Sequence, residues 1–239
     1  RLNSIGIDVI TRADPDYPDR YRKRLGESAP PLLFYSGERE LLGQKGLAIV
    51  GSRHLEETGE KCADWIGNSC GLSGMVLYSG GAKGVDPISM EDSPVARGFA
   101  VGVMANIMEM ELRKPHYRDA IQKGDLCLVT PYLPSASFNV GLAMGRNKLI
   151  YTLSDYAIVI ASSANKGGTW SGAIENLKND WVPLFVITYD QMPEGNQLLI
   201  DKGAIALPLK TVEDYANLEK NLENQSKKIP PKPTQGTLF

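Results

Sequence analysis

Residues 47–53 read Leu47-Ala48-Ile49-Val50-Gly51-Ser52-Arg53, four apolar residues followed by a glycine, a hydroxyl side chain and a cation. An apolar run without alternating polar residues is typical of a strand that is buried on both faces of a sheet. Further runs of this kind follow at residues 75–78, 99–103, 126–129, 156–160 and 184–187. Together the runs predict a parallel sheet.

Amphipathic, helix-like segments alternate with these runs, at residues 57–70, 115–123, 137–145, 170–179 and 211–224. Their lengths suit crossover connections between parallel strands. The alternation predicts an α/β fold, a Rossmann-like doubly wound, mainly parallel sheet with helices on both faces. We expect this domain at residues 41–208. An N-terminal segment with a short helix and a Pro-rich connection (1–40) should precede it, and a C-terminal helix with a Pro-rich tail (209–239) should follow.

The overall charge excludes one class of function. The chain has 239 residues and a formal net charge of -2, so it is not a basic protein that coats nucleic acid through bulk charge, and any nucleic-acid site must be local. Three cysteines without a C-x-x-C pair and two histidines predict neither a disulfide framework nor a metal site. We expect no cofactor. No apolar run approaches the roughly 18 residues of a membrane span and no leader is evident, so the expected location is cytoplasmic.

Small residues, hydroxyls and a cation recur after three of the predicted strands. The three loops contain Gly51-Ser52-Arg53, then Ser79-Gly80 with Lys83-Gly84, and then Lys166-Gly167-Gly168-Thr169. The carboxyl ends of parallel strands share one edge of a sheet, and there glycine-lined loops, helix N-termini and cations favour anions. Taken singly, each loop could be a plain tight turn. Turn geometry explains the glycines but not a cation in each loop, so the three loops predict a phosphate-binding rim.

A fourth candidate is Arg146-Asn147-Lys148, which lies between the helix-like segment 137–145 and the fifth predicted strand. The asparagine can bond either a base edge or the backbone, and it is flanked by two cations. A solvated charged turn is the common fate of such a segment. The segment leads directly into the sheet, and we favour a phosphate or nucleic-acid contact mainly because of the family resemblance described next.

Motifs along most of residues 5–190 add to this pattern. They are Ile5-Gly6-Ile7, Asp14-Pro15-Asp16-Tyr17-Pro18, Pro30-Pro31-Leu32-Leu33-Phe34-Tyr35-Ser36-Gly37, Ala48 to Arg53, Ser79-Gly80-Gly81-Ala82-Lys83-Gly84-Val85-Asp86 and Arg146 to Ile150. In this order and spacing they resemble the DNA-processing protein A (DprA/Smf) family. Individual motifs are shared with other Rossmann-like nucleotide-binding proteins, which include cytokinin-activating phosphoribohydrolases.

The resemblance implies a non-catalytic homodimer that binds single-stranded DNA in a basic pocket at the strand ends and hands the strand to a RecA-type recombinase. By motif, the implied DNA-contacting residues are Arg53, Lys83, Arg146 and Lys148, and the loop-shaping residues are Gly51, Ser52, Ser79, Gly80 and Gly84. Lys166 is added by the anion-binding argument and not by the resemblance.

The chain also departs from the family pattern. Gly81, Lys83 and Met90 stand where the family usually has Leu, Arg and His, and no winged-helix sequence follows Pro208. We therefore expect a divergent member without a C-terminal winged helix, acting in DNA processing, recombination or mobile-element and defence biology. Recombinase loading is the implied property that these departures weaken most.

Two alternatives to strand binding stay open. A phosphoribohydrolase needs an acid beside a nucleotide pocket, and Glu175 follows Gly167-Gly168-Thr169 as in part of that enzyme motif, although a second Gly-Thr unit is missing. A nucleotide-binding sensor or regulatory partner would present the same loops to the phosphates of a free nucleotide. Trp170 and Tyr151 are the aromatic candidates for base stacking, with a core position as the competing interpretation.

Both ends of the chain carry possible interaction segments. The basic run Arg20-Tyr21-Arg22-Lys23-Arg24 could hold a phosphate backbone, although such runs are usually the solvated face of a helix. The Pro-rich tail ends in Gln235-Gly236-Thr237-Leu238-Phe239, which resembles the peptide by which bacterial replication proteins dock into the sliding clamp. In that interpretation Leu238 and Phe239 are apolar anchors and Gln235 is the polar contact.

Overall fold

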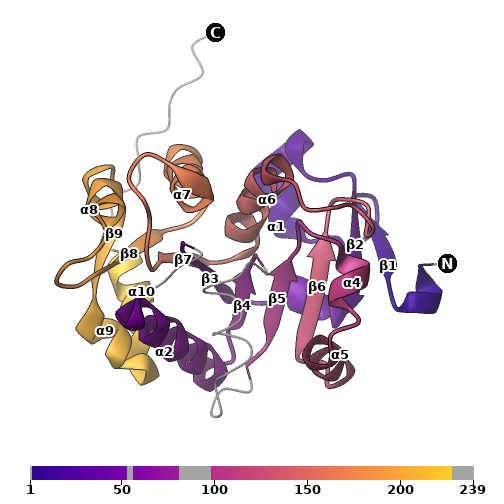
Figure 1. Ribbon diagram of the computed structural model, residues 1–239, viewed down its shortest axis with the longest axis horizontal. Helices are drawn as coiled ribbons and strands as arrows, with labels where there is room; N and C mark the ends of the chain where they lie inside the picture. The colour runs from indigo at the N-terminus through magenta and orange to yellow at the C-terminus, as the bar shows by residue number, and fades with distance from the viewer. Residues whose placement is uncertain (1, 53–55, 81–97, 228–239) are drawn as a thin grey trace, which may run out of the picture.

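One sheet runs through the computed structural model, which describes residues 2–52, 56–80 and 98–227 (Figure 1). In these residues the strand order is β1-β2-β6-β5-β4-β3-β7-β8-β9. The parallel part contains β3 (Gly46–Val50), β4 (Val76–Ser79), β5 (Ala100–Val103), β6 (Leu126–Thr130), β7 (Tyr156–Val159), β8 (Leu184–Thr188) and β9 (Ile205–Pro208). At the other edge, β2 (Leu32–Gly37) runs antiparallel to β6 and to β1 (Asp8–Thr11).

Helices cover both faces of this sheet, as the sequence predicts. One face packs against α1 (Asp19–Leu25), α6 (Val140–Leu153), α7 (Gly167–Asn179) and α8 (Glu194–Asp201). The other packs against α2 (Glu57–Ser73), α4 (Met108–Glu111), α5 (Pro115–Gln122), α9 (Leu209–Glu213) and α10 (Leu218–Ser226). Short 3-10 helices are η1 (Asn3–Ile5), η2 (Gly26–Ser28), η3 (Arg39–Gly43) and η4 (Tyr215–Asn217). No helix in the described ranges is long and apolar enough to cross a membrane.

The predicted strands β3 to β8 are confirmed, and their two-sided burial has a simple cause. In β3, Ala48 packs into one core while its neighbours Leu47 and Ile49 pack into the other. Side chains of a strand alternate between the faces of a sheet, so a strand that is covered on both sides is apolar throughout. The fold class predicted from the apolar runs is therefore correct.

Sequence reasoning missed β1, β2 and β9, which lie toward the two edges of the sheet. In β1 only Ile10 is buried, and Asp8 and Val9 are exposed. Strand β1 thus lacks the continuous apolar signature of the central strands, whereas β2 and β9 contain short apolar runs, at residues 32–35 and 205–207, that sequence reasoning did not assign to strands. Two of the missed strands come from the expected N-terminal segment 1–40, so that segment contributes to the same sheet as the expected domain.

Two predicted helices differ from the structure. Helix α6 covers Val140–Leu153 and not residues 137–145. Its start is fixed by Asn139, whose side chain accepts a 2.7 Å hydrogen bond from the backbone N–H of Gly141. Buried residues such as Leu149 continue the helix beyond the charged residues. The charged segment beginning at Arg146 is thus helical and not a turn. The C-terminal segment 211–224 is divided into α9, η4 and α10.

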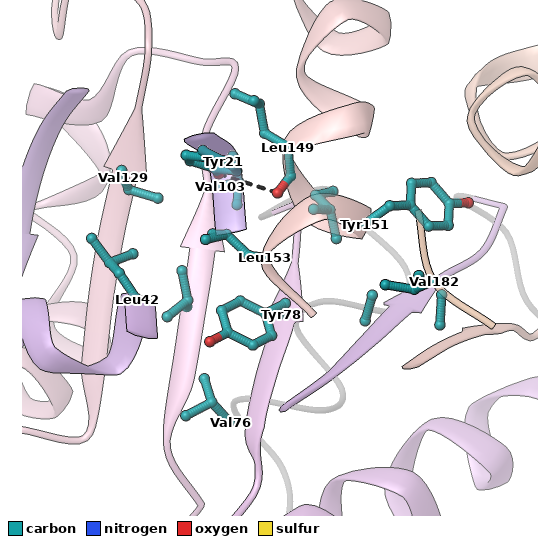
Figure 2. Close-up of a cluster of buried hydrophobic side chains, with 14 of the residues drawn as sticks. Tyr21, Leu42, Val76, Tyr78, Val103, Val129, Leu149, Tyr151, Leu153 and Val182 are labelled. Atoms are coloured by element: carbon teal, nitrogen blue, oxygen red, sulfur yellow. Dashed lines mark hydrogen bonds between the residues drawn. The ribbon is translucent and has the colours of Figure 1, made fainter. Parts of the chain in front are cut away.

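The basic run of α1 anchors the carboxyl end of α6. The hydroxyl of Tyr21 donates to the carbonyl of Leu149 at 3.1 Å (Figure 2), and Arg24 donates to the carbonyls of Thr152 at 2.9 Å and Ser154 at 2.6 Å. The last carbonyls of a helix lack intrahelical partners and carry partial negative charge, which a guanidinium stabilises. This arrangement favours a structural role for the run over a hold on a phosphate backbone.

Arg20 extends the anchor to the sheet. Its Nη2 lies 3.0 and 2.9 Å from the two carboxylate oxygens of Asp155, and one of these oxygens also accepts the N–H of Gly46 at 2.8 Å. Gly46 begins β3, and Asp155 immediately precedes β7. One carboxylate therefore holds the amino ends of two central strands to α1.

Candidate phosphate-binding site

A pocket of about 580 Å³ lies beyond the carboxyl ends of the central strands. Strand β3 has β4 on one side and β7 on the other. The chain leaves β3 through α2 on one face of the sheet, whereas it reaches β7 through α6 on the opposite face. The two connections diverge at this point and leave a crevice, which is where doubly wound sheets bind ligands.

The structure brings most of the described candidate residues to this pocket. The ones that line it are Gly51, Ser52, Gly80, Arg146, Asn147, Lys166, Gly167, Gly168 and Thr169. Ser79 does not line it, because its side chain is fully buried and its hydroxyl lies 3.4 Å from the carbonyl of Ile49. Lys148 is on α6 but is not among the lining residues either. Arg53, Lys83, Gly84, Gln235, Leu238 and Phe239 lie outside the described residues.

Backbone hydrogen bonds join the loops that follow β3 and β7. The N–H of Ile160 donates to the carbonyl of Val50 at 3.0 Å, and the N–H of Ser52 donates to the carbonyl of Ala161 at 3.0 Å. The parallel pairing of the two strands is thereby continued past their ends. The Ser52 loop and the loop leading to Lys166 consequently leave the sheet side by side and form adjoining walls of the pocket.

The amino end of α7 forms another wall. Gly167, Gly168 and Thr169 make its first turn and line the pocket, and its N-cap residue Lys166 makes no side-chain cap. Gly167 has φ +86°, a left-handed conformation that glycine adopts without steric cost. The first N–H groups of a helix carry partial positive charge, so this wall suits an anion. The exposed Lys166 adds a full positive charge beside it.

Arg146 supplies a nearly buried charge, with 5% of its surface exposed. Its Nη1 donates to the carbonyl of Val103, at the end of β5. Its Cζ would lie 2.6 Å from a β-carbon on Gly80, at the end of β4. The guanidinium thus lies across the ends of two strands. A cation at low dielectric attracts an anion more strongly than a solvated one does.

Asn147 ties α6 to the start of α7. Its Nδ2 donates to the carbonyl of Gly168 at 2.9 Å. A β-carbon on Gly172, one turn further along α7, would lie 3.2 Å from the Cβ of Asn147, so the two helices pack closely there. The sequence left open whether the side chain of Asn147 bonds a base edge or the backbone, and in the structure it bonds the backbone.

The pocket also has an apolar wall, of which the sequence singled out Tyr151 alone as a candidate. Its members are Ile49, Val50, Val140, Ala143, Met144, Ile150 and Tyr151, and Ser163 lies among the other lining residues. Most come from α6, at positions three and four apart, which is the spacing of one helix face. That periodicity would have been visible had the helix been continued through the charged segment. Tyr151 and Trp170 are 1% and 8% exposed, so both occupy core positions and neither presents an open ring for stacking.

The pocket walls contain no carboxylate, histidine or cysteine among the residues that the structure describes. Glu175, the acid of the phosphoribohydrolase alternative, is on α7 outside the lining residues, and its backbone carbonyl accepts from Asn179 at 2.8 Å. Acid–base catalysis requires a titratable group within reach of the ligand. The described part of the pocket therefore carries groups that suit an anion, and Glu175 is not among the residues that line it.

Comparisons with known proteins identify the family and the fold of the chain. The sequence model of the family described as DNA recombination-mediator protein A matches residues 8–219. The chain is 27% identical to Protein Smf of Synechocystis sp. in an alignment of 166 positions, which covers 66% of this chain and 40% of that protein. It is 22% identical to DNA processing protein DprA of Bacillus subtilis in an alignment of 240 positions, gaps included, which covers 97% of this chain and 74% of the relative. The chain thus spans well under half the length of the Synechocystis relative.

Solved structures show the same fold. DNA processing protein A from Streptococcus pneumoniae superposes with a TM-score of 0.72 at 25% identity, covering 84% of this chain and 71% of that one. The protein of the same name from Helicobacter pylori, which was studied for its single-stranded DNA binding mode, gives a TM-score of 0.72 at 21% identity and covers 90% and 96% of the two chains. The match over residues 8–219 covers most of the chain, which therefore belongs to the DNA recombination-mediator protein A family.

Proposed function

We propose that this chain binds single-stranded DNA without cleaving it, in DNA processing during recombination or in mobile-element and defence biology. The observation that carries the proposal is the convergence of Gly51-Ser52, Gly80, Arg146 and the first turn of α7 on one pocket. These groups are backbone N–H donors, hydroxyls and cations, which together suit phosphodiester oxygens. Family membership and the DNA-binding relative supply the class of ligand.

A single strand fits this geometry better than a duplex. The anion-binding groups lie in a hollow at the strand ends, between the loops and α6. A single strand is flexible enough to place one or two phosphates in such a hollow, whereas a duplex is stiff over a length far greater than the pocket. Arg53 and Lys83 follow Ser52 and Gly80 in the sequence, and in the proposal they extend the contact along the strand.

Binding to fluorescein-labelled oligothymidylate, followed by fluorescence anisotropy across salt, tests the proposal. The variants are Arg53→Ala, Lys83→Ala, Arg146→Ala and Lys166→Ala. Each lost phosphate contact should reduce the salt slope by about 0.7. Lys23→Ala is the matched control, because Lys23 is 77% exposed and lies on α1, outside the pocket. Absence of oligonucleotide binding by the wild type, or equal salt slopes in all variants, would refute the proposal.

A free nucleotide is the second candidate ligand. The pocket volume, about 580 Å³, lies within the range of small-molecule sites, and its mixture of apolar and polar walls is typical of them. A nucleotide-binding sensor or regulatory partner would use the same anion-binding groups. Competition separates the two cases: micromolar binding of thymidine monophosphate together with no binding of oligothymidylate would establish the nucleotide as the ligand.

Three partner interactions are part of the proposal. They are a homodimer, a RecA-type recombinase, and a sliding clamp that receives the C-terminal Gln235, Leu238 and Phe239. The first two rest on family membership, and the third rests on the sequence of the tail. Titration of purified clamp with the full chain and with a chain lacking its last five residues tests the third. Equal affinity of the two chains for the clamp would refute the proposed clamp interaction.

A further inference from the structure

Asn196, on α8, is a fully buried asparagine (0% exposed) that makes three hydrogen bonds to backbone near the pocket without lining it. Its Nδ2 donates to the carbonyl of Ile160 at 2.9 Å and to that of Ile187 at 3.0 Å. Its Oδ1 accepts the N–H of Ser162 at 2.9 Å. Both donors and the acceptor of one side-chain amide are therefore used at the carboxyl ends of β7 and β8.

The residue before Asn196 shows how closely α8 approaches the same loop. A β-carbon on Gly195 would lie 2.6 Å from the carbonyl carbon of Ser163 and would overlap the carbonyl of Ser162. Real β-carbons do not make such contacts, so the backbone of α8 lies directly against the loop backbone. Helix α8 therefore packs directly against the loop that follows β7.

We propose that Asn196 is a positioning residue for the phosphate-binding pocket, an inference that rests on the proposed function. The connection runs through backbone. Asn196 holds Ser162, the adjacent Ala161 accepts the N–H of Ser52, and Ser163 and Lys166 line the pocket. One buried amide thus sets the relative placement of the loops that follow β3 and β7.

The chemistry of the site explains why an amide is suited to this position. Two carbonyls require donors and one N–H requires an acceptor, and a side-chain amide offers both in one rigid plane. Aspartate offers acceptors alone when ionised and would leave two carbonyls without donors. A buried polar group without a partner is costly, so the loop would shift to satisfy these groups elsewhere.

Asn176 provides a matched control within the same chain. It is also 0% exposed, and it bonds backbone with both ends of its amide: Nδ2 donates to the carbonyl of Val182 at 2.9 Å, and Oδ1 accepts the N–H of Val182 at 3.2 Å. These bonds join the last part of α7 to the segment before β8. Neither Asn176 nor Val182 lines the pocket, so substitution of Asn176 measures the loss of stability without a direct change at the pocket.

The test compares the affinity of Asn196→Ala and Asn176→Ala for oligothymidylate, measured by fluorescence anisotropy. The temperature is chosen so that urea unfolding curves show both variants to be folded. We expect both to lose stability. Asn196→Ala should bind roughly tenfold more weakly, a loss typical of residues that support a site from behind its direct contacts. The salt slope should stay at the wild-type value, because no cation is removed. If Asn196→Ala does not fold, Asn196→Ser replaces it, because its hydroxyl is neutral and can both donate and accept a hydrogen bond.

Amide hydrogen exchange gives a second readout that is independent of the ligand. Exchange at Ser52 and Ser162 should be faster in the Asn196 variant than in wild type and unchanged in the Asn176 variant. Equal binding by the two variants, or unchanged exchange at Ser52 and Ser162, would overturn the positioning role. Absence of oligonucleotide binding by the wild type would instead refute the proposed function, and the exchange experiment would still decide the role of Asn196.

Discussion

The guanidinium of Arg146 occupies the space that a side chain on Gly80 would need. A β-carbon on Gly80 would lie 2.6 Å from Cζ of Arg146, well inside van der Waals contact. Gly80 directly follows β4, and Arg146 reaches it from α6. The glycine at this point therefore provides room for a cation in the pocket, in addition to shaping a turn.

Substitution of Gly80 tests this relationship. Gly80→Ala should displace the Arg146 guanidinium and weaken oligothymidylate binding, with a loss of about tenfold measured by anisotropy. Gly43→Ala is the control, because a β-carbon at Gly43 meets no atom within 4 Å and the residue has no positive φ. If Gly80→Ala bound oligothymidylate as tightly as Gly43→Ala, the side chain of Arg146 would not be set by this contact.

The basic run of α1 should contribute to stability and not to DNA binding. Arg20→Gln removes the bonds to Asp155 and to the carbonyl of Gln44 and should lower the free energy of unfolding by about 1–3 kcal/mol. Lys23→Gln, at a 77% exposed side chain, should change it by less than about 0.5 kcal/mol. Urea unfolding measures both. A reduced salt slope of oligonucleotide binding in Arg20→Gln would contradict this assignment.

Buried thiols should make the fold sensitive to alkaline pH. Burial raises the pKa of Cys62 and of Cys70 from 9.0 to about 12 in each case. The native state then keeps protons that the unfolded state loses, so stability is complete below about pH 9 and falls as the pH rises toward 12. Urea unfolding across this range measures the fall, which should be shallower in a Cys62→Ala/Cys70→Ala variant. An identical pH dependence would show that the thiols do not contribute.

Glu175→Gln should leave ligand binding unchanged, because Glu175 does not line the pocket. The wild type should release no ribose 5-phosphate from nucleoside monophosphates, and a colorimetric assay for reducing sugar measures this. Turnover by the wild type that is lost in Glu175→Gln would contradict the binding role and support the phosphoribohydrolase alternative.

The central strands were predictable because burial on both faces makes their consecutive residues apolar. Ile158 and Val159 of β7 face opposite cores, and this two-sided burial produces an apolar run that local sequence reveals. Strand β1 has only Ile10 buried, so pairing with β2, and not local pattern, decides its structure. Tertiary pairing of this kind is not encoded in a short window of sequence.

The site was predictable where it is built from loops and less so where it is built from a helix. Gly51, Gly80 and Gly167 stand out after strands, and all three reach the pocket. The charges of Arg146 and Lys148 predict the end of a helix, but Leu149 and Leu153 continue its buried face. The role of Asn196 left no signal, because a single asparagine in a helix does not reveal which carbonyls it meets.

The carboxylate of Asp155 binds Arg20 and Gly46 at the amino ends of β3 and β7, whereas the ligand pocket lies at their opposite ends. The contacts that hold the frame together and the residues that are proposed to bind the ligand therefore lie at opposite ends of the same two strands. A descendant of this chain could exchange its pocket loops for ones with another specificity and still inherit an intact frame. Selection for heat tolerance could act at the other end of the strands without disturbing recognition.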